Sequence, residues 1–296
     1  MFDAHSHIRI TNDDKKNTQN INEYILNMKK NGIKEAIVMV DPFIDELKCP
    51  LNSNHYVKTK NGTKPGHIIC KCTFCQKVVY EGIDPFIKYN IYLMDKLTMY
   101  SNLHVYPVIS VTDTSMQWLI DYYQDLFGPK LEGIKAYTGL SAYSLDDLKP
   151  VRCNVPMLVH AGTYQNQNPA KMIQFIKKFN NYFQIAHFAG LELDAINELK
   201  KIDNVFIDVS PATYMFDYYI AQNHNGGLFN KNKILSLEDM YYMLLSNFDL
   251  SRIVWGSDTP YSTQDMELDA ILKSKIFTQT EKELVLCKNI RKIIKI

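Results

Sequence analysis

The sequence predicts an α/β fold, a (β/α)8 TIM barrel, on three observations. Eight short apolar segments recur along 296 residues, amphipathic segments separate them, and few of the apolar segments show strict polar–apolar alternation. Apolar runs of this kind are typical of parallel strands that are covered on both faces. Repeated strand–helix units indicate a barrel, whereas the alternative, a doubly wound sheet, usually has fewer strands.

Each element is expected from its local pattern. The strands are FDAHSHI (2–8), EAIVMV (35–40), LHVYPVI (103–109), GIKAY (133–137), PMLVH (156–160), FQIAH (183–187), NVFIDVS (204–210) and RIVWGS (252–257). Amphipathic helices are expected over 20–31, 87–100, 170–179 and 191–201. Thr280 with Glu283 three residues later predicts a capping box at the start of a final helix.

One domain over residues 1–296 is therefore expected, with an insertion over 41–84 after the second strand and another long connection over 211–236. Hydrophobic residues make up 46% and charged residues 22% of the chain, and the net charge is +1. This balance gives no support to nucleic-acid binding. With no long apolar run and no signal-like start in MFDAHSHI, we expect a cytoplasmic protein without a membrane contact. Homo-oligomerisation stays open.

Polar residues cluster at the ends of the expected strands. Asp3, His5 and His7 share one face of the first strand because side chains alternate with a period of two. The others are Lys135, His160, His187 and Asp258, each near the C-terminal end of a different strand. Strand C-termini meet at the catalytic mouth of a barrel. Imidazoles with a carboxylate suit zinc or a similar divalent ion, which lowers the pKa of a bound water toward ~7.

Taken in order, these motifs resemble the amidohydrolase superfamily, and in particular its amidohydrolase-related (amidohydrolase 2) branch. The resemblance rests on FDAHSHI, the lysine of GIKAY, MLVHAG, IAHFAG, VWGSDTPY and the closing KNIRKI, and it covers nearly the whole chain except 41–84. TatD-like nucleases share the first-strand HxH but resemble a pattern with glutamate where this chain has Lys135.

The resemblance implies a role for each site residue. His5, His7 and His160 match metal ligands, and Asp258 matches the aspartate that contacts the metal and accepts a proton from the nucleophilic water. His187 matches a residue that binds a second ion in two-metal members and acts on the substrate in one-metal members. Lys135 matches a lysine that is carboxylated in some members and a free amine in others. One or two active-site metals are open, and Asp3 is expected to support the ligands.

The insertion carries four cysteines, Cys49, Cys70, Cys72 and Cys75. Four thiolates satisfy a tetrahedral structural zinc site, which would order a lid beside the mouth. His55 or His67 is a candidate to replace one cysteine, and redox chemistry or unrelated thiols are the alternatives. Cys153 and Cys287 are expected to be packing residues.

The sequence thus predicts a metal-dependent hydrolase that uses a metal-activated water on a small-molecule amide, lactone or related carbonyl-type bond. Arg9 is either a clamp for a substrate carboxylate or a surface charge, and Tyr137 contacts either the substrate or the core. The resemblance also admits a metal-dependent decarboxylase or hydratase. A third hypothesis is a non-catalytic barrel that binds a protein or RNA through the zinc insert.

Overall fold

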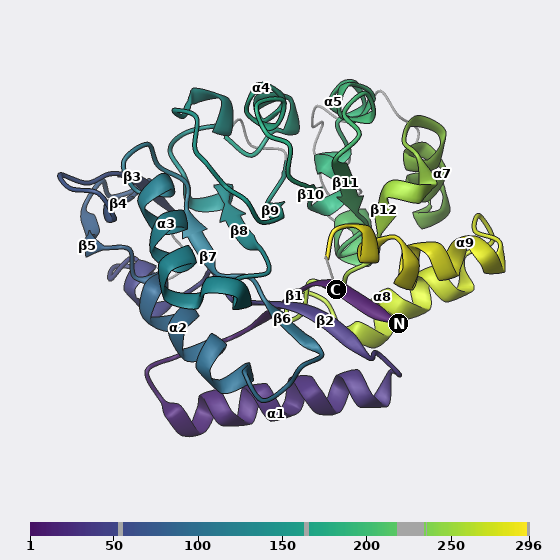
Figure 1. The fold of residues 1–296 in the computed structure, drawn as a ribbon, viewed down its shortest axis with the longest axis horizontal. Coiled ribbons are helices and arrows are strands. Elements are labelled where there is room, and N and C mark those ends of the chain that lie inside the picture. The colour runs from purple at the N-terminus through teal and green to yellow at the C-terminus, as the bar shows by residue number, and fades with distance from the viewer. Residues whose placement is uncertain (53–55, 163–165, 218–233, 235, 295–296) are drawn as a thin grey trace.

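Parallel strands form the centre of the fold and helices surround them (Figure 1). The computed structural model describes residues 1–296 except 53–55, 163–165, 218–233, 235 and 295–296. The parallel strands are β1 (Phe2–Ile8), β2 (Glu35–Val40), β6 (Leu103–Val105), β7 (Val108–Ser110), β8 (Ile134–Tyr137), β9 (Met157–Val159), β10 (Phe183–Ile185), β11 (Val205–Asp208) and β12 (Ile253–Val254). The predicted α/β class is confirmed.

The parallel strands form two sheets that follow the chain in order. One sheet has the order β1-β2-β6, and the other has the order β12-β11-β10-β9-β8-β7. The predicted strand 103–109 is divided into β6 and β7 around Pro107, which has no N–H to continue the ladder. At the other end, Ala4 N donates to Trp255 O at 2.9 Å, so β1 lies beside the segment that follows β12.

The strand β1 is buried along its whole length, although its two faces differ. Phe2, Ala4 and Ile8 belong to the hydrophobic core, whereas His5 and His7 lie on the opposite face. Period-two alternation within one buried strand therefore separates packing residues from polar ones.

The helices begin and pack as their sequences dictate. In the longest, Ile21, Tyr24 and Met28 are buried at spacings of three and four, the pattern of one helix face. The Asp13 side chain caps its start by accepting from Lys15 N and Lys16 N. The helices are α1 (Asp14–Lys30), α2 (Phe86–Leu97), α3 (Met116–Phe127), α4 (Ile173–Ile176), α5 (Leu193–Lys200), α7 (Leu237–Asn247), α8 (Gln264–Lys273) and α9 (Gln279–Glu283).

The predicted capping box of the last helix is wrong by two residues. The stretch TQTEKE contains two Thr-x-x-Glu matches, and the structure uses the earlier one. Thr278 accepts from Glu281 N, and the Glu281 carboxylate accepts from Thr278 N at 2.8 Å. Thr278, which directly follows the buried Phe277, caps the helix, and Thr280 lies inside its first turn.

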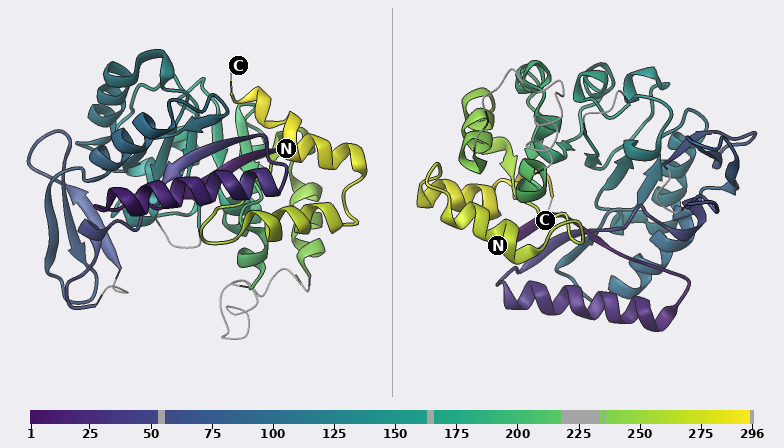
Figure 2. Two further views of the ribbon diagram at one scale, coloured as in Figure 1. Left: turned by 90° about the horizontal axis from the view of Figure 1, so that it is seen from below. Right: turned by 180° about the vertical axis from the view of Figure 1, so that it is seen from behind.

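The insertion forms a third sheet, which is antiparallel and which the sequence did not predict. Its strands are β3 (Val57–Asn61), β4 (His67–Cys72) and β5 (Val78–Ile83), and Figure 2 shows them at the edge of the molecule. The sheet packs tightly on α3 at Gly66, which has a φ of +75° and where a Cβ atom would lie 2.4 Å from the Trp118 ring. Glycine is therefore required at this contact.

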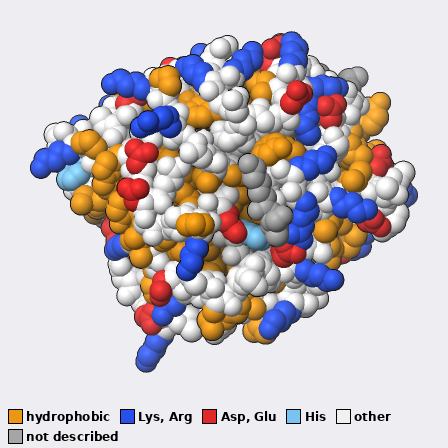
Figure 3. Space-filling view, viewed as in Figure 1, with side chains coloured by type: hydrophobic (Ala, Val, Ile, Leu, Met, Phe, Trp, Pro, Cys, Tyr) orange, Lys and Arg blue, Asp and Glu red, His pale blue; other side chains and the backbone are white. Residues whose placement is uncertain are grey.

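Two expectations from the sequence concern membrane-spanning helices and the distribution of charge on the surface. Within the described residues, none of the helices has both the length and the apolar composition needed to cross a bilayer. On the face drawn in Figure 3, the lysines and arginines of the described residues are interspersed with aspartates and glutamates.

Asp84 joins the end of the insertion to β7. Its carboxylate accepts from Phe86 N at 3.0 Å and from Ser110 N at 3.1 Å, and burial raises its pKa to about 6. The folded protein keeps this proton up to about pH 6, while the unfolded chain loses it near its usual value of 3.8. Since the folded state binds more protons in this window, stability falls as the pH rises.

The side chain in Asp84→Asn stays neutral at every pH. We therefore expect this variant to lack the loss of stability that deprotonation of Asp84 causes as the pH rises. The free energy of unfolding of the wild type relative to the variant should fall by about 2 kcal/mol between pH 4 and pH 7. Urea unfolding at several pH values measures it, with the exposed Asp95→Asn as the control. A constant difference would show that folding does not raise the pKa of Asp84.

Candidate active site

A pocket of about 250 Å³ opens where the parallel strands end. His7 comes from β1, and His160 directly follows β9. His187 and Asp258 lie a few residues after the ends of β10 and β12. Its walls are largely aromatic and apolar, and they include Phe43, Tyr56, Tyr137, Leu140, Met215 and Tyr261. Four of the polar side chains predicted from strand ends therefore line a single pocket.

His5, His7 and Asp258 form a close cluster. His5 Nε2 lies 3.3 Å from His7 Nε2 and 3.3 Å from Asp258 Oδ1, and His7 Nε2 lies 3.4 Å from the same oxygen. Asp258 is held with a left-handed φ of 53°, and its N–H donates to His5 O at 2.7 Å. The buried Asp3 accepts from Ser257 N at 2.9 Å and so fastens the neighbouring residue to β1, in line with the support expected of it.

Hydrogen bonds at Nδ1 fix the orientation of the His5 and His7 rings. His7 Nδ1 lies 3.0 Å from Val40 O, and His5 Nδ1 lies 3.0 Å from Asp208 Oδ2. These oxygens only accept hydrogen bonds, so each Nδ1 carries the proton and each Nε2 presents a lone pair. Burial, followed by the charge of Lys135, lowers the pKa of His5 to about 4, which keeps its ring neutral.

Asp208 is a site residue that the sequence analysis missed. Its Oδ2 accepts from His5 Nδ1 and from Gln184 Nε2 at 2.9 Å, and its Oδ1 accepts from His187 N at 3.0 Å. Burial raises the pKa of this carboxyl, but the contacts with His5 and His187 outweigh it and hold the pKa well below its usual range. An aspartate in the apolar strand NVFIDVS was the signal that could have revealed it.

Lys135 lies fully buried on β8, with Nζ 2.9 Å from His5 Nε2. Burial lowers its pKa to about 8, so that roughly one lysine in ten is a neutral amine at pH 7. Only the neutral amine can bind a metal or react with carbon dioxide. Lys135 thus lies beside the cluster. The carboxylated lysine and the free amine both remain predictions for its side chain.

His160 and His187 form a second pair beside the cluster. His187 Nδ1 donates to Ser210 O at 2.7 Å, and His187 Nε2 lies 3.0 Å from His160 Nδ1. Burial lowers the pKa of His160 well below its usual value. His160 therefore contacts His187 rather than the three-residue cluster in which the sequence analysis placed it as a fourth ligand.

The backbone after β10 is unusual. Five consecutive residues, His187 to Leu191, have φ between 49° and 61°, and only one of them, Gly190, is glycine. Each non-glycine residue in this conformation costs about 1 kcal/mol or more. Buried packing of Phe188 and Ala189 and the bond from His187 N to Asp208 hold the turn.

The two predicted substrate contacts differ in position. Tyr137 lines the pocket, and its ring centroid lies 4.9 Å from that of His160. Arg9 Nε donates to Asp41 at 2.9 Å, its side chain is 54% exposed, and it is not among the described residues that line the pocket. The contact of Arg9 with a substrate stays a prediction.

The structure separates the cysteines of the insertion. Cys49, Cys72 and Cys75 lie together, whereas Cys70 Sγ lies 3.4 Å from Thr59 Oγ1 in the core. His67 begins β4 and is not in the cysteine group, and His55 lies outside the described residues.

The cluster of His5, His7 and Asp258 fits a divalent metal. Ligand atoms about 2.0–2.1 Å from a tetrahedral ion lie roughly 3.4 Å apart, which agrees with the separations of 3.3–3.4 Å found here. Two nitrogen lone pairs and a carboxylate facing one another also require a positive charge between them. Lys135 Nζ approaches only His5 among these three at hydrogen-bond distance.

Comparisons with known proteins match part of the chain to a family and nearly all of it to known folds. The amidohydrolase family model matches residues 151–296, and no curated protein matches the chain. A probable 2-pyrone-4,6-dicarboxylic acid hydrolase from Acinetobacter baumannii, 15% identical, has a TM-score of 0.58 and covers 100% of this chain and 99% of its own. A 5-carboxyvanillate decarboxylase from Sphingomonas paucimobilis, 8% identical, has a TM-score of 0.62 with the same coverage.

An amidohydrolase from Burkholderia multivorans with bound zinc, 11% identical, has a TM-score of 0.58 and covers 99% of this chain and 98% of its own. At these identities the three structures show the shared fold alone.

Asp208→Asn tests the support beneath the histidines. An amide nitrogen in place of Oδ2 would face two donors, so His5 would lose its fixed tautomer. We expect the affinity for zinc to fall roughly 10–100-fold, measured by competition with a fluorescent chelator. The exposed Asp125→Asn is the control, and equal affinity in the two variants would contradict the role of Asp208.

Proposed function

We propose that this chain is an enzyme of the amidohydrolase type, a metal-dependent hydrolase of a small-molecule amide, lactone or related carbonyl-type bond; the family match over residues 151–296 and the shared fold support this. The observation that supports this most strongly is the cluster of His5, His7 and Asp258 at 3.3–3.4 Å, of which His7 and Asp258 line the pocket. We further infer that the two parallel sheets close into the predicted (β/α)8 barrel, because Ala4 N bonds to Trp255 O across the seam.

His5, His7 and Asp258 would hold the metal, with His160 the fourth predicted ligand and Lys135 and His187 the candidates for a second ion. A divalent ion such as zinc supplies Lewis acidity and lowers the pKa of a coordinated water toward ~7. The protein supplies neutral imidazoles of fixed tautomer and a buried, preorganised carboxylate.

Asp258 is the proposed general base. Burial raises its pKa, but the neighbouring His5 and His187 outweigh this and lower the pKa below its usual value, so the carboxylate is ionised at neutral pH. Its second oxygen, Oδ2, lies 4.0 Å from His187 Nδ1. Asp258 can therefore accept the proton of an attacking water, while His187 lies beside the same space to assist the leaving group.

The pocket walls favour a small, largely apolar substrate. Phe43, Tyr56 and Tyr137 contribute aromatic surface from three separate segments, and the space between the walls is about 250 Å³. Such walls exclude water from around the reacting bond, which strengthens the electrostatic contribution of Asp258.

Aromatic walls also suit the second candidate, decarboxylation of an aromatic acid, since a 5-carboxyvanillate decarboxylase shares the fold. Analysis of products separates the two reactions, because carbon dioxide is released only by the lyase. A hydratase would instead add water across a double bond, whose π bond is broken, and would give a single product.

Asp258→Asn should abolish turnover while the fold is retained. Loss of a general base lowers kcat roughly 10²–10⁴-fold, measured on whichever member of a panel of amides, lactones and aromatic carboxylates the wild type converts. The exposed Asp203→Asn is the control. Undiminished turnover in Asp258→Asn would rule out Asp258 as the general base, whereas a wild type that converts no member of the panel would support a non-catalytic barrel that binds a protein or RNA.

Metal content gives an independent test of the proposed function. Elemental analysis of the wild type should find stoichiometric divalent metal, and His7→Gln should lose the active-site equivalent. His104→Gln is a matched control, because His104 is a buried histidine that pairs with Glu132 at 2.6 Å rather than with the site. A wild type without stoichiometric metal rules the proposal out.

A further inference from the structure

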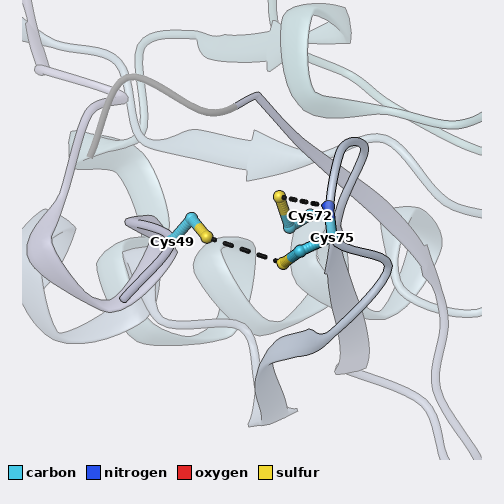
Figure 4. Close-up of side chains that lie close together, drawn as sticks. All are labelled: Cys49, Cys72 and Cys75. Atoms are coloured by element: carbon cyan, nitrogen blue, oxygen red, sulfur yellow. Dashed lines mark hydrogen bonds between the residues drawn. The ribbon is translucent and has the colours of Figure 1, made fainter. Parts of the chain in front are cut away.

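The insertion brings three sulfur atoms together. Cys49 follows the short 3-10 helix η1 (Asp45–Leu47), while Cys72 ends β4 and Cys75 lies in the turn toward β5. Figure 4 shows the three side chains pointing into the space between these segments. We propose that Cys49, Cys72 and Cys75 bind a second metal, zinc or a similarly thiophilic divalent ion, which fastens the insertion beside the pocket.

The sulfur separations fit a metal rather than a disulfide. Cys49 Sγ lies 3.8 Å from Cys75 Sγ, and the three sulfurs lie within 4.8 Å of one another. Thiolates about 2.3 Å from a tetrahedral zinc ion are roughly 3.8 Å apart, whereas the atoms of a disulfide are about 2.05 Å apart. The three sulfurs would occupy three positions of a tetrahedral ion and leave the fourth to another donor.

The turn from Cys72 to Lys77 presents its sulfurs in the way a thiolate site needs. Cys75 N donates to Cys72 Sγ at 3.4 Å. Gln76 N donates to Cys72 O at 3.0 Å, and the left-handed φ of 59° at Gln76 closes the turn. Hydrogen bonds from backbone N–H groups to sulfur stabilise its negative charge, so the backbone itself prepares this site.

Cys70 is excluded from the proposed site, which revises the predicted set of four. Cys70 is fully buried, its sulfur contacts Thr59 Oγ1, and it packs in the hydrophobic core. It thus behaves as a small packing residue.

The proposed metal would join two segments of the pocket wall. Thr73, inside the cysteine turn, donates from N at 2.9 Å and from Oγ1 at 3.1 Å to Tyr56 O. Tyr56 lines the pocket, and so does Phe43, which lies six residues before Cys49. Metal binding is independent of the proposed function, while its expected kinetic effect, a weaker substrate fit when the clip is lost, depends on that function.

The first experiment measures metal content in the full-length protein. We expect Cys49→Ser and Cys75→Ser each to contain one equivalent of zinc less than the wild type. Cys70→Ser and Cys287→Ser, which change cysteines outside the group, should contain as much as the wild type. Unchanged zinc in Cys49→Ser, or loss in Cys70→Ser with retention in Cys75→Ser, would overturn the proposed ligand set.

The second experiment needs no variant and so does not depend on how a substituted insertion folds. The wild type is stripped with a chelator and reloaded with Co²⁺ alone. Thiolate ligation gives a sulfur-to-cobalt charge-transfer absorption, which histidine and carboxylate ligands do not give. Its absence, or a Cys49–Cys75 disulfide found by thiol counting, would overturn the proposal whatever the active-site metal does.

Kinetics test the consequence for the pocket. In Cys75→Ser that retains its active-site metal, KM should rise about tenfold while kcat changes little, because the catalytic residues are untouched. An equal fall in kcat and kcat/KM would contradict a role in substrate fit, and the metal measurements would still decide the site.

Discussion

The contact between the Asp208 carboxylate and His5 is the interaction on which the site depends most. A buried carboxylate is costly unless donors surround it, and the donors that surround Asp208 come from β1, β10 and the residues after β10 and β11. Satisfying this charge fixes His5 and the backbone of His187 together. The positions of residues more than 180 apart in sequence are thus coupled through one carboxylate.

Much of the fold follows from short-range patterns. The strands β1 and β2 begin and end where their apolar segments do, because burial on both faces leaves little ambiguity. Where two local patterns competed, the sequence alone could not decide which one the structure uses. Two capping boxes overlap in TQTEKE, and only the burial of Phe277 decides between them. The strands of the insertion were not predicted, because segments such as VKTKN have few apolar residues and bury only alternate side chains.

The proximity of the candidate site residues was predictable where apolar strands carry polar side chains, as for His5, His7, Lys135 and Asp258. Asp208 carries the same signal but lies beneath the pocket, where its role depends on partners from other strands. Spacing alone cannot separate Cys70 from Cys72, since both lie on one face of β4. Their difference arises from the neighbouring Thr59 and from the turn at Cys75, which are tertiary features.

The left-handed stretch from His187 to Leu191 has a consequence for redesign. Phe188, Ala189 and Leu191 occupy a backbone conformation that β-branched side chains adopt only at high cost, and this turn positions His187. A mutagenesis library aimed at new substrates would therefore lose most of its members if it included this stretch. The walls at Phe43 and Tyr56, in the insertion and away from the catalytic cluster, are the more evolvable part of the pocket.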